Sequence, residues 1–188
     1  MQTDMTVGKP MKMILDFTIP VFIGNVFQQF YNMADAIIVG KFVGTKGLAA
    51  VGSTGTIMFL IIGFLTGLTA GFTVLTSQKF GAGKMDEMRQ SVGNAALLSI
   101  IISVIMTAVS MVGMHSLLTL MHTPEDIFQD AYTYIMIISA GIIATIFYNL
   151  FSSYLRAVGN SKIPLVFLVF SAALNVILDL VLIINFKM

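Results

Sequence analysis

The sequence contains no cysteine and very little charge. Only 10% of its 188 residues are charged, whereas 57% are hydrophobic, and the mean hydropathy is +0.93. The lack of cysteine excludes disulfides, thiolate metal sites and cysteine nucleophiles. A net charge of +1 provides no field to steer polyanions, which argues against a nucleic-acid binder. A soluble domain usually carries about 25% charged residues, and a small globule cannot bury this much apolar surface. The composition therefore argues against a soluble enzyme or a disordered chain, and predicts that lipid surrounds most of the protein.

Long uncharged runs define the predicted architecture. A membrane-spanning helix needs roughly 20 mostly apolar residues. Residues 47–78, 90–124 and 131–155 contain no Asp, Glu, Lys or Arg, and two further apolar segments carry embedded carboxylates. The sequence therefore predicts an all-α, polytopic membrane helix bundle with short links and five spans, near residues 14–40, 48–76, 92–118, 131–155 and 163–185.

The distribution of Lys and Arg between the links predicts the orientation of this bundle. With the N-terminus inside, the inner side holds Lys9, Lys12, Lys79, Lys84, Arg89, Arg156 and Lys162, and the outer side holds Lys41, Lys46 and Lys187. Cytoplasmic loops of membrane proteins carry an excess of Lys and Arg. We therefore expect a multi-pass protein of the cell membrane with a cytoplasmic N-terminus.

Two carboxylates, Asp35 and Asp179, lie inside predicted spans. A charge in hydrocarbon costs at least ~2.5–3.5 kcal/mol, so such residues are functional candidates. Asp35 precedes Gly40 by five residues and Asp179 precedes Asn185 by six, which places them roughly 7.5 and 9 Å below the outer ends of their spans. Two carboxylates in a shared cavity of low dielectric can hold one proton between them, or a cation can replace that proton. The sequence thus predicts an ion-coupled site.

Polar residues accompany both carboxylates at helical spacing. Gln28 and Asn32 share a helix face with Asp35, Tyr31 lies one turn before it, and Asn175 lies one turn before Asp179. Amide and carboxylate oxygens suit hard cations such as Na⁺, and they also hydrogen-bond to a protonated carboxyl. Gln28, Tyr31 and Asn32 are therefore predicted to line a polar cavity. The alternative is that these side chains only hold helices together.

Pro20 lies inside the first span. It removes the hydrogen bond to the carbonyl of Asp16 and favours a kink. A kink at this position would let the segment that carries Asp35 move between two states. The alternative is that membrane helices simply tolerate proline.

Two further patterns are interpreted as structural. Gly63, Gly67 and Gly71 form a tandem GxxxG pattern in the second span, which predicts close helix packing. Asp16, near the inner end of the first span, is expected to pair with Lys12 one turn earlier.

The sequence offers no catalytic or metal-binding constellation. His115 and His122 lie in or near one outer link without a third ligand, and no Ser, His and Asp set clusters within the spans. We therefore predict no enzyme activity, no catalytic residue and no metal site.

Several motifs together resemble a known family. The dipeptide IP at 19–20 followed by QQFYNMADAIIVG at 28–40 resembles the first helix of the multidrug and toxic compound extrusion (MATE) family. LAAVG at 48–52, QKFGAG at 78–83, RAVGNSKIP at 156–164 and NVILD at 175–179 resemble later motifs of that family, in its order. The resemblance covers essentially the whole chain.

The resemblance implies a function and a site. It implies a transporter of two six-helix lobes that exports organic, often cationic, drugs in exchange for Na⁺ or H⁺, with no cofactor besides that coupling ion. It also implies that Asp35, Asn175 and Asp179 form the cation site of the N-terminal lobe, and that bending at Pro20 accompanies transport.

Length is the departure from the family pattern. The five predicted spans match one N-terminal lobe over residues 1–188, without the sixth helix and the second lobe. Since alternating access needs two repeats that rock against each other, we expect the C-terminal lobe to be a necessary partner, besides the bilayer and the small-molecule substrates.

Two alternatives to drug export remain open from the sequence. One is a lipid or oligosaccharide flippase of the same superfamily, although no Lys or Arg lies in the middle of a span to favour it. The other is a membrane fragment that does not transport, in which Asp35→Asn and Asp179→Asn would leave every activity unchanged.

Overall fold

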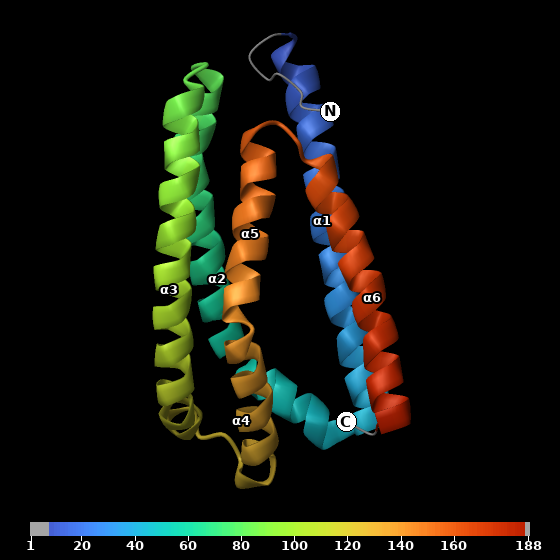
Figure 1. Ribbon diagram of the computed structural model, residues 1–188. Helices are drawn as coiled ribbons and strands as arrows, with labels where there is room; N and C mark the ends of the chain where they lie inside the picture. Colours follow the sequence, from blue (N-terminus) through green and yellow to red (C-terminus); the bar gives the residue numbers. More distant parts are fainter. Residues whose placement is uncertain (1–7, 187–188) are drawn as a thin grey trace. The chain divides into compact units, whose positions relative to one another are not determined.

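Helices form all the regular structure in residues 8–186, which are the residues that the computed structural model describes (Figure 1). Side chains are described up to residue 183. The elements, in chain order, are α1 (Pro10–Ile38), the π-helical segment η1 (Val39–Val43), α2 (Thr45–Gly81), α3 (Met85–Leu120), α4 (Glu125–Ala140), α5 (Ile142–Ala157) and α6 (Lys162–Phe186). The predicted all-α fold is confirmed.

Four of the predicted spans are single long apolar helices. They cover residues 10–43, 45–81, 85–120 and 162–183, each long and apolar enough to cross a membrane. The fourth of the five predicted spans, at 131–155, is not one straight helix. It is the pair α4 and α5, bent by 49°. The five-span prediction therefore matches the structure when this bent pair counts as one span.

The break between α4 and α5 lies at Gly141. The N–H of Gly141 donates to the carbonyl of Ile138 at 2.9 Å, which tightens the last turn of α4, and α5 then begins at Ile142. A Cβ atom at this position would lie 3.3 Å from the same carbonyl oxygen, so glycine allows the close turn. Hydropathy could not predict the break, because a bend leaves the apolar composition of the segment unchanged.

The chain forms two compact units, which we describe separately. Unit 1 comprises residues 1–48 and 155–188, with α1, η1 and α6, and unit 2 comprises residues 49–154.

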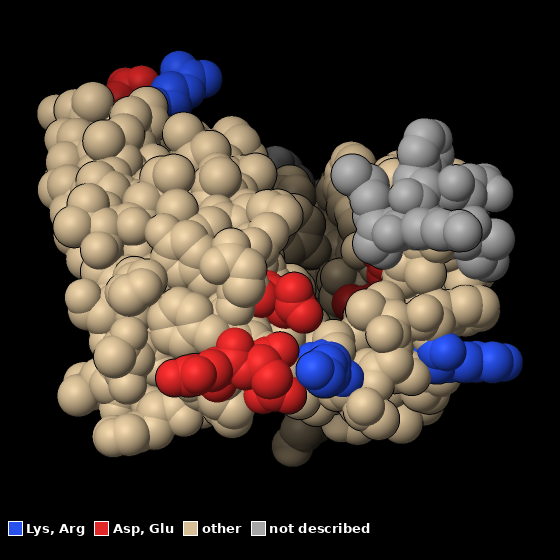
Figure 2. Space-filling model, turned by 90° about the horizontal axis from the view of Figure 1, so that it is seen from below, with Lys and Arg blue, Asp and Glu red and all other residues tan. Residues whose placement is uncertain are grey.

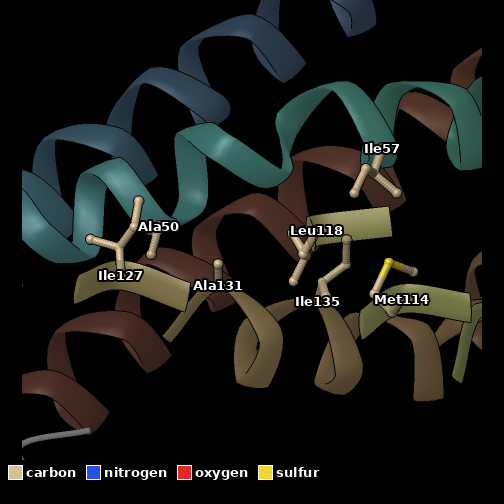
Figure 3. Close-up of a cluster of buried hydrophobic side chains, with 7 residues drawn as sticks. All are labelled: Ala50, Ile57, Met114, Leu118, Ile127, Ala131 and Ile135. Carbon is tan, nitrogen blue, oxygen red and sulfur yellow. The ribbon is translucent and has the colours of Figure 1, made fainter. Parts of the chain in front are cut away.

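Small and medium apolar side chains form the core of unit 2. Three helices, α2, α3 and α4, bring together seven buried residues (Figure 3): Ala50, Ile57, Met114, Leu118, Ile127, Ala131 and Ile135. A second cluster joins Leu65 of α2 to Ile142 and Ile146 of α5. Hydroxyl groups also lie inside this unit, as in the contact between Thr76 and Ser91, whose oxygens are 3.1 Å apart.

Unit 1 is built on the contact of α1 with α6, which run side by side in Figure 1. Gly24 is buried in this contact, and a Cβ there would meet methyl carbons of Leu165 and Leu168 at 3.6 Å each. The outer faces of both helices expose large apolar side chains such as Phe22 and Phe170, each 65% exposed. Uncharged residues also make up most of the surface in the view of Figure 2. Such surfaces suit lipid rather than water.

Two packing predictions are not met within the units. Gly63, Gly67 and Gly71 are all exposed, and a Cβ at any of them would meet nothing within 4 Å, so no helix of unit 2 packs on this stripe. Asp16 makes no ion pair with Lys12 among the described residues and instead lines a cavity. A pattern of spacing identifies a helix face, but it cannot identify which neighbour covers that face.

Candidate functional site

The end of α1 and the second half of α6 bring two carboxylates together within unit 1. Asp35 lies in the last turn of α1, and its backbone carbonyl accepts a hydrogen bond from the N–H of Val39, where the π-helical segment begins. The Asp35 carboxyl group lies beside two other polar groups. These are the carboxyl group of Asp179 on α6 and the hydroxyl group of Tyr31, one turn earlier on α1. Two carboxyl groups, one from the first helix of the chain and one from the last, therefore lie next to each other.

Two oxygen atoms of the residues predicted as a cation site are buried and have no hydrogen-bond partner. They are the Oδ1 atoms of Asp35 and of Asn175, which lies one turn before Asp179. An unpaired buried polar atom costs about 1–3 kcal/mol, so buried oxygens normally have partners. The geometry thus brings together Asp35 and Asp179, two of the three residues that the sequence predicted as a cation site, while Asn175 precedes Asp179 by one turn on α6. Cation binding by the three residues stays a prediction.

The predicted polar lining divides into two groups. Tyr31 is half-buried and lies next to Asp35, whereas Gln28 and Asn32 are exposed. The amide of Asn32 donates to Gln29 Oε1 at 3.3 Å and does not reach the carboxyl pair. A role for Gln28 and Asn32 in lining a substrate cavity stays a prediction.

Pro20 is half-buried inside α1, and the helix continues through it from Pro10 to Ile38. The predicted movement about Pro20 stays a prediction.

The donor set has a clear chemical preference. Carboxylate, amide and phenol oxygens are hard ligands, which favour Na⁺ or a proton over softer metals. Because two ionised carboxylates repel each other in a medium of low dielectric, a bound proton or cation would stabilise the pair.

Sequence reasoning missed two other buried oxygens, both in unit 2. The hydroxyl oxygens of Ser99 and Ser139 are buried without partners. Ser139 also lines a small apolar cavity of about 20 Å³ near the break at Gly141. The spacing of serines within an apolar run does not indicate which serine hydroxyls will find a hydrogen-bond partner in the fold and which will not.

Comparisons with known proteins agree with this architecture. The MatE family model matches residues 20–181, which is most of the chain and includes all three residues of the candidate cation site. The "Probable multidrug resistance protein YpnP" of Bacillus subtilis is 31% identical over 185 residues, which cover 98% of this chain and 42% of that relative.

Solved structures match the fold closely. An outward-facing multidrug resistance MATE family transporter of the MOP superfamily superposes with a TM-score of 0.92 at 27% identity, over 99% of this chain and 41% of that one. A MOP superfamily transporter from Pyrococcus furiosus, described as having a binding pocket of reverse polarity, gives a TM-score of 0.91 at 28% identity, over 97% of this chain and 40% of that one. The chain thus spans about two fifths of the length of the proteins that it matches. With the family model covering most of its residues, the chain belongs to the MatE family.

Proposed function

We propose that this chain is the N-terminal part of a multidrug efflux antiporter, which exports organic, often cationic, compounds in exchange for Na⁺ or H⁺. The name of the Bacillus subtilis relative, a probable multidrug resistance protein, supports the export of drugs. We also propose a cytoplasmic N-terminus in the cell membrane and a requirement for the C-terminal part of the transporter, since the chain spans 42% of that relative.

One observation carries the proposed coupling. The Asp35 carboxyl lies beside that of Asp179, and its Oδ1 atom is buried without a hydrogen-bond partner. The Oδ1 atom of Asn175, one turn before Asp179, is also buried without a partner. An empty site of this kind holds uncompensated charge, and ion binding removes that cost. The free energy released on binding can then drive a conformational change, provided that the two conformations bind the ion with different affinities.

Direct ion binding by the purified chain tests the site itself. We expect the chain in detergent at alkaline pH to bind radioactive Na⁺, or to release protons when Na⁺ is added. Asp35→Asn and Asp179→Asn should each abolish both signals. Asp86→Asn, which changes a carboxylate on the surface of α3, should leave them unchanged.

Transport needs a longer protein than this chain. We therefore propose to join it to the C-terminal part of the Bacillus subtilis relative and to follow ethidium export from vesicles under an inward Na⁺ or H⁺ gradient. Export that depends on the gradient and stops with Asp35→Asn supports the proposal. Export that persists in both carboxylate variants would contradict it.

A further inference from the structure

A second polar site lies in unit 1, away from the carboxylate pair. It is a cavity of about 260 Å³ between the first half of α1 and the turn that leads into α6. Its lining consists of Met13, Asp16, Phe17, Gly159, Asn160, Ser161 and Lys162. The volume holds several water molecules, or a small polar group of similar size.

The wall formed by the turn is buried and ordered by its own hydrogen bond. Asn160 and Ser161 are only 7% and 6% exposed. The Oδ1 atom of Asn160 accepts a hydrogen bond from the N–H of Ile163 at 3.1 Å, which caps the start of α6. Ser161 lines the cavity, and its hydroxyl has no hydrogen-bond partner among the described residues and is not one of the buried unpartnered oxygens. A hydroxyl that opens onto a cavity and has no protein partner is free to donate to a polar group bound there.

Opposite charges lie on the two sides of this cavity. Lys162 is the first residue of α6, where the backbone N–H groups carry partial positive charge. Asp16 supplies a carboxylate from α1, and Pro20 cannot donate a hydrogen bond to the Asp16 carbonyl. Neither charged side chain forms an ion pair with a described residue, and both are exposed. The cavity therefore offers an anion-binding side and a cation-binding side at once.

The position of the cavity relative to the helix ends favours a lipid. Residues 10–43 form one helical span of 34 residues, which is about 51 Å long. The hydrocarbon core is about 30 Å thick, so each end of this span reaches about 10 Å into the headgroup region. Asp16, six residues from the start of α1, then lies at headgroup level, as does Lys162 at the start of its span.

We propose that this cavity binds the headgroup of a phospholipid that carries a primary ammonium group, such as phosphatidylethanolamine. The lipid phosphate would accept hydrogen bonds from Lys162, from the Ser161 hydroxyl and from the N-terminal N–H groups of α6. The ammonium would donate to the carboxylate of Asp16. A choline headgroup has no N–H to donate, and the glycerol headgroup of phosphatidylglycerol offers only neutral O–H donors, so neither gives Asp16 a hydrogen bond from a charged donor. The proposal is independent of the transport function.

Native mass spectrometry of the purified chain in detergent tests the proposal. Short-chain phosphatidylethanolamine, phosphatidylcholine and phosphatidylglycerol are titrated separately. We expect the ethanolamine lipid to bind about tenfold more tightly than the other two, because a charge-assisted hydrogen bond contributes roughly that factor. Asp16→Asn should remove this preference, and Asp16→Glu should restore much of it. Lys162→Gln should weaken the binding of all three lipids.

Two control variants, a further variant of the cavity and a folding check keep the result interpretable. Lys12→Gln changes a neighbouring lysine that does not line the cavity, and Asp86→Asn changes a distant carboxylate, so both should retain the preference. Ser161→Ala removes a hydroxyl that would donate to the lipid phosphate and leaves the charge unchanged. It should weaken the binding of all three lipids several-fold. Helix content by circular dichroism identifies any variant that fails to fold.

Two outcomes would overturn the proposal. One is equal binding of the three lipids by the unmodified chain, or a preference that survives in Asp16→Asn. The other is binding of soluble phosphoethanolamine as tightly as the lipid, which would assign the cavity to a small solute.

Discussion

The carboxyl group of Asp35 on α1 lies beside that of Asp179 on α6, within one compact unit formed by the two ends of the chain. Neither residue has a nearby Lys or Arg in sequence to compensate its charge. Like charges at such a position require a proton, a cation or an aqueous surrounding. A proton or cation bound between the two carboxyl groups would therefore stabilise unit 1.

Neutralising one member of the pair should therefore stabilise the protein when Na⁺ is absent. We expect Asp35→Asn to raise the free energy of unfolding in sodium-free buffer at alkaline pH by about 1 kcal/mol, because an amide N–H can donate to the remaining carboxylate of Asp179. Added Na⁺ should raise the melting temperature of the unmodified chain and leave that of the variant unchanged. Thermal unfolding in detergent measures both effects. A lower melting temperature for Asp35→Asn without Na⁺ would show that the two charges do not oppose each other.

Gly24 lies where α1 meets α6, so the stability of its variants should depend on the size of the side chain that is introduced. Gly24→Ala places a methyl group in ordinary contact with Leu165 and Leu168, and it adds helix propensity of up to about 1 kcal/mol. We expect it to be neutral or stabilising. Gly24→Leu cannot fit in the same space and should destabilise by about 1–3 kcal/mol. Chemical unfolding of the two variants checks the prediction, and equal stabilities would mean that the helices do not meet at Gly24.

Ser99 and Ser103 provide a matched pair on α3. Both are fully buried, but the Ser103 hydroxyl donates to the carbonyl of Ile100 at 2.8 Å, whereas the Ser99 hydroxyl has no partner. We expect Ser99→Ala to be neutral or stabilising by about 1 kcal/mol, and Ser103→Ala to destabilise by about 0.5–1.5 kcal/mol. Melting curves in detergent measure the difference. The opposite order would indicate an internal water molecule bound to Ser99.

The turn between α2 and α3 contains a small cluster of charges. Glu87 pairs with Lys79, and it also pairs with Lys84 at 2.8 Å. The hydrogen bond from Lys84 to Glu87 and the attraction between their charges raise the pKa of the Lys84 ammonium above its ordinary value. A raised pKa leaves less of the reactive free amine at a given alkaline pH. We therefore expect Glu87→Gln to speed the acylation of Lys84 by an amine-reactive reagent at pH about 9, as measured by peptide mass spectrometry.

A neighbouring carboxylate serves as the control for that experiment. Asp86 lies next to Glu87 but pairs with Arg89, at 3.9 Å. Asp86→Asn should leave the acylation rate of Lys84 unchanged. An unchanged rate in Glu87→Gln would mean that the Lys84–Glu87 pair does not persist in solution.

Hydropathy predicted the helices well, because a membrane-spanning helix requires a long apolar segment, and such segments can be recognised directly in the sequence. It placed α6 within one residue of each end and α2 within five, but it began α3 seven residues late. It also identified Asp35 and Asp179 as charges within apolar segments. It missed the break at Gly141 and the π-helical segment after Ile38. The bend at Gly141 and the change to π-helical hydrogen bonding after Ile38 both leave the apolar composition of their segments unchanged.

The sequence by itself determined that this is an all-helical membrane protein and which carboxylates lie inside it. Only the tertiary structure decided how those residues are grouped. It placed Asp35 beside Asp179 and left Gln28 and the glycines of α2 exposed. It also placed Asp16, which was expected in an ion pair, in a polar cavity with Ser161 and Lys162. The physical reason is that helical spacing determines which residues share a face of one helix. Which other helix covers that face depends on contacts between distant segments, here the packing of the first helix against the last.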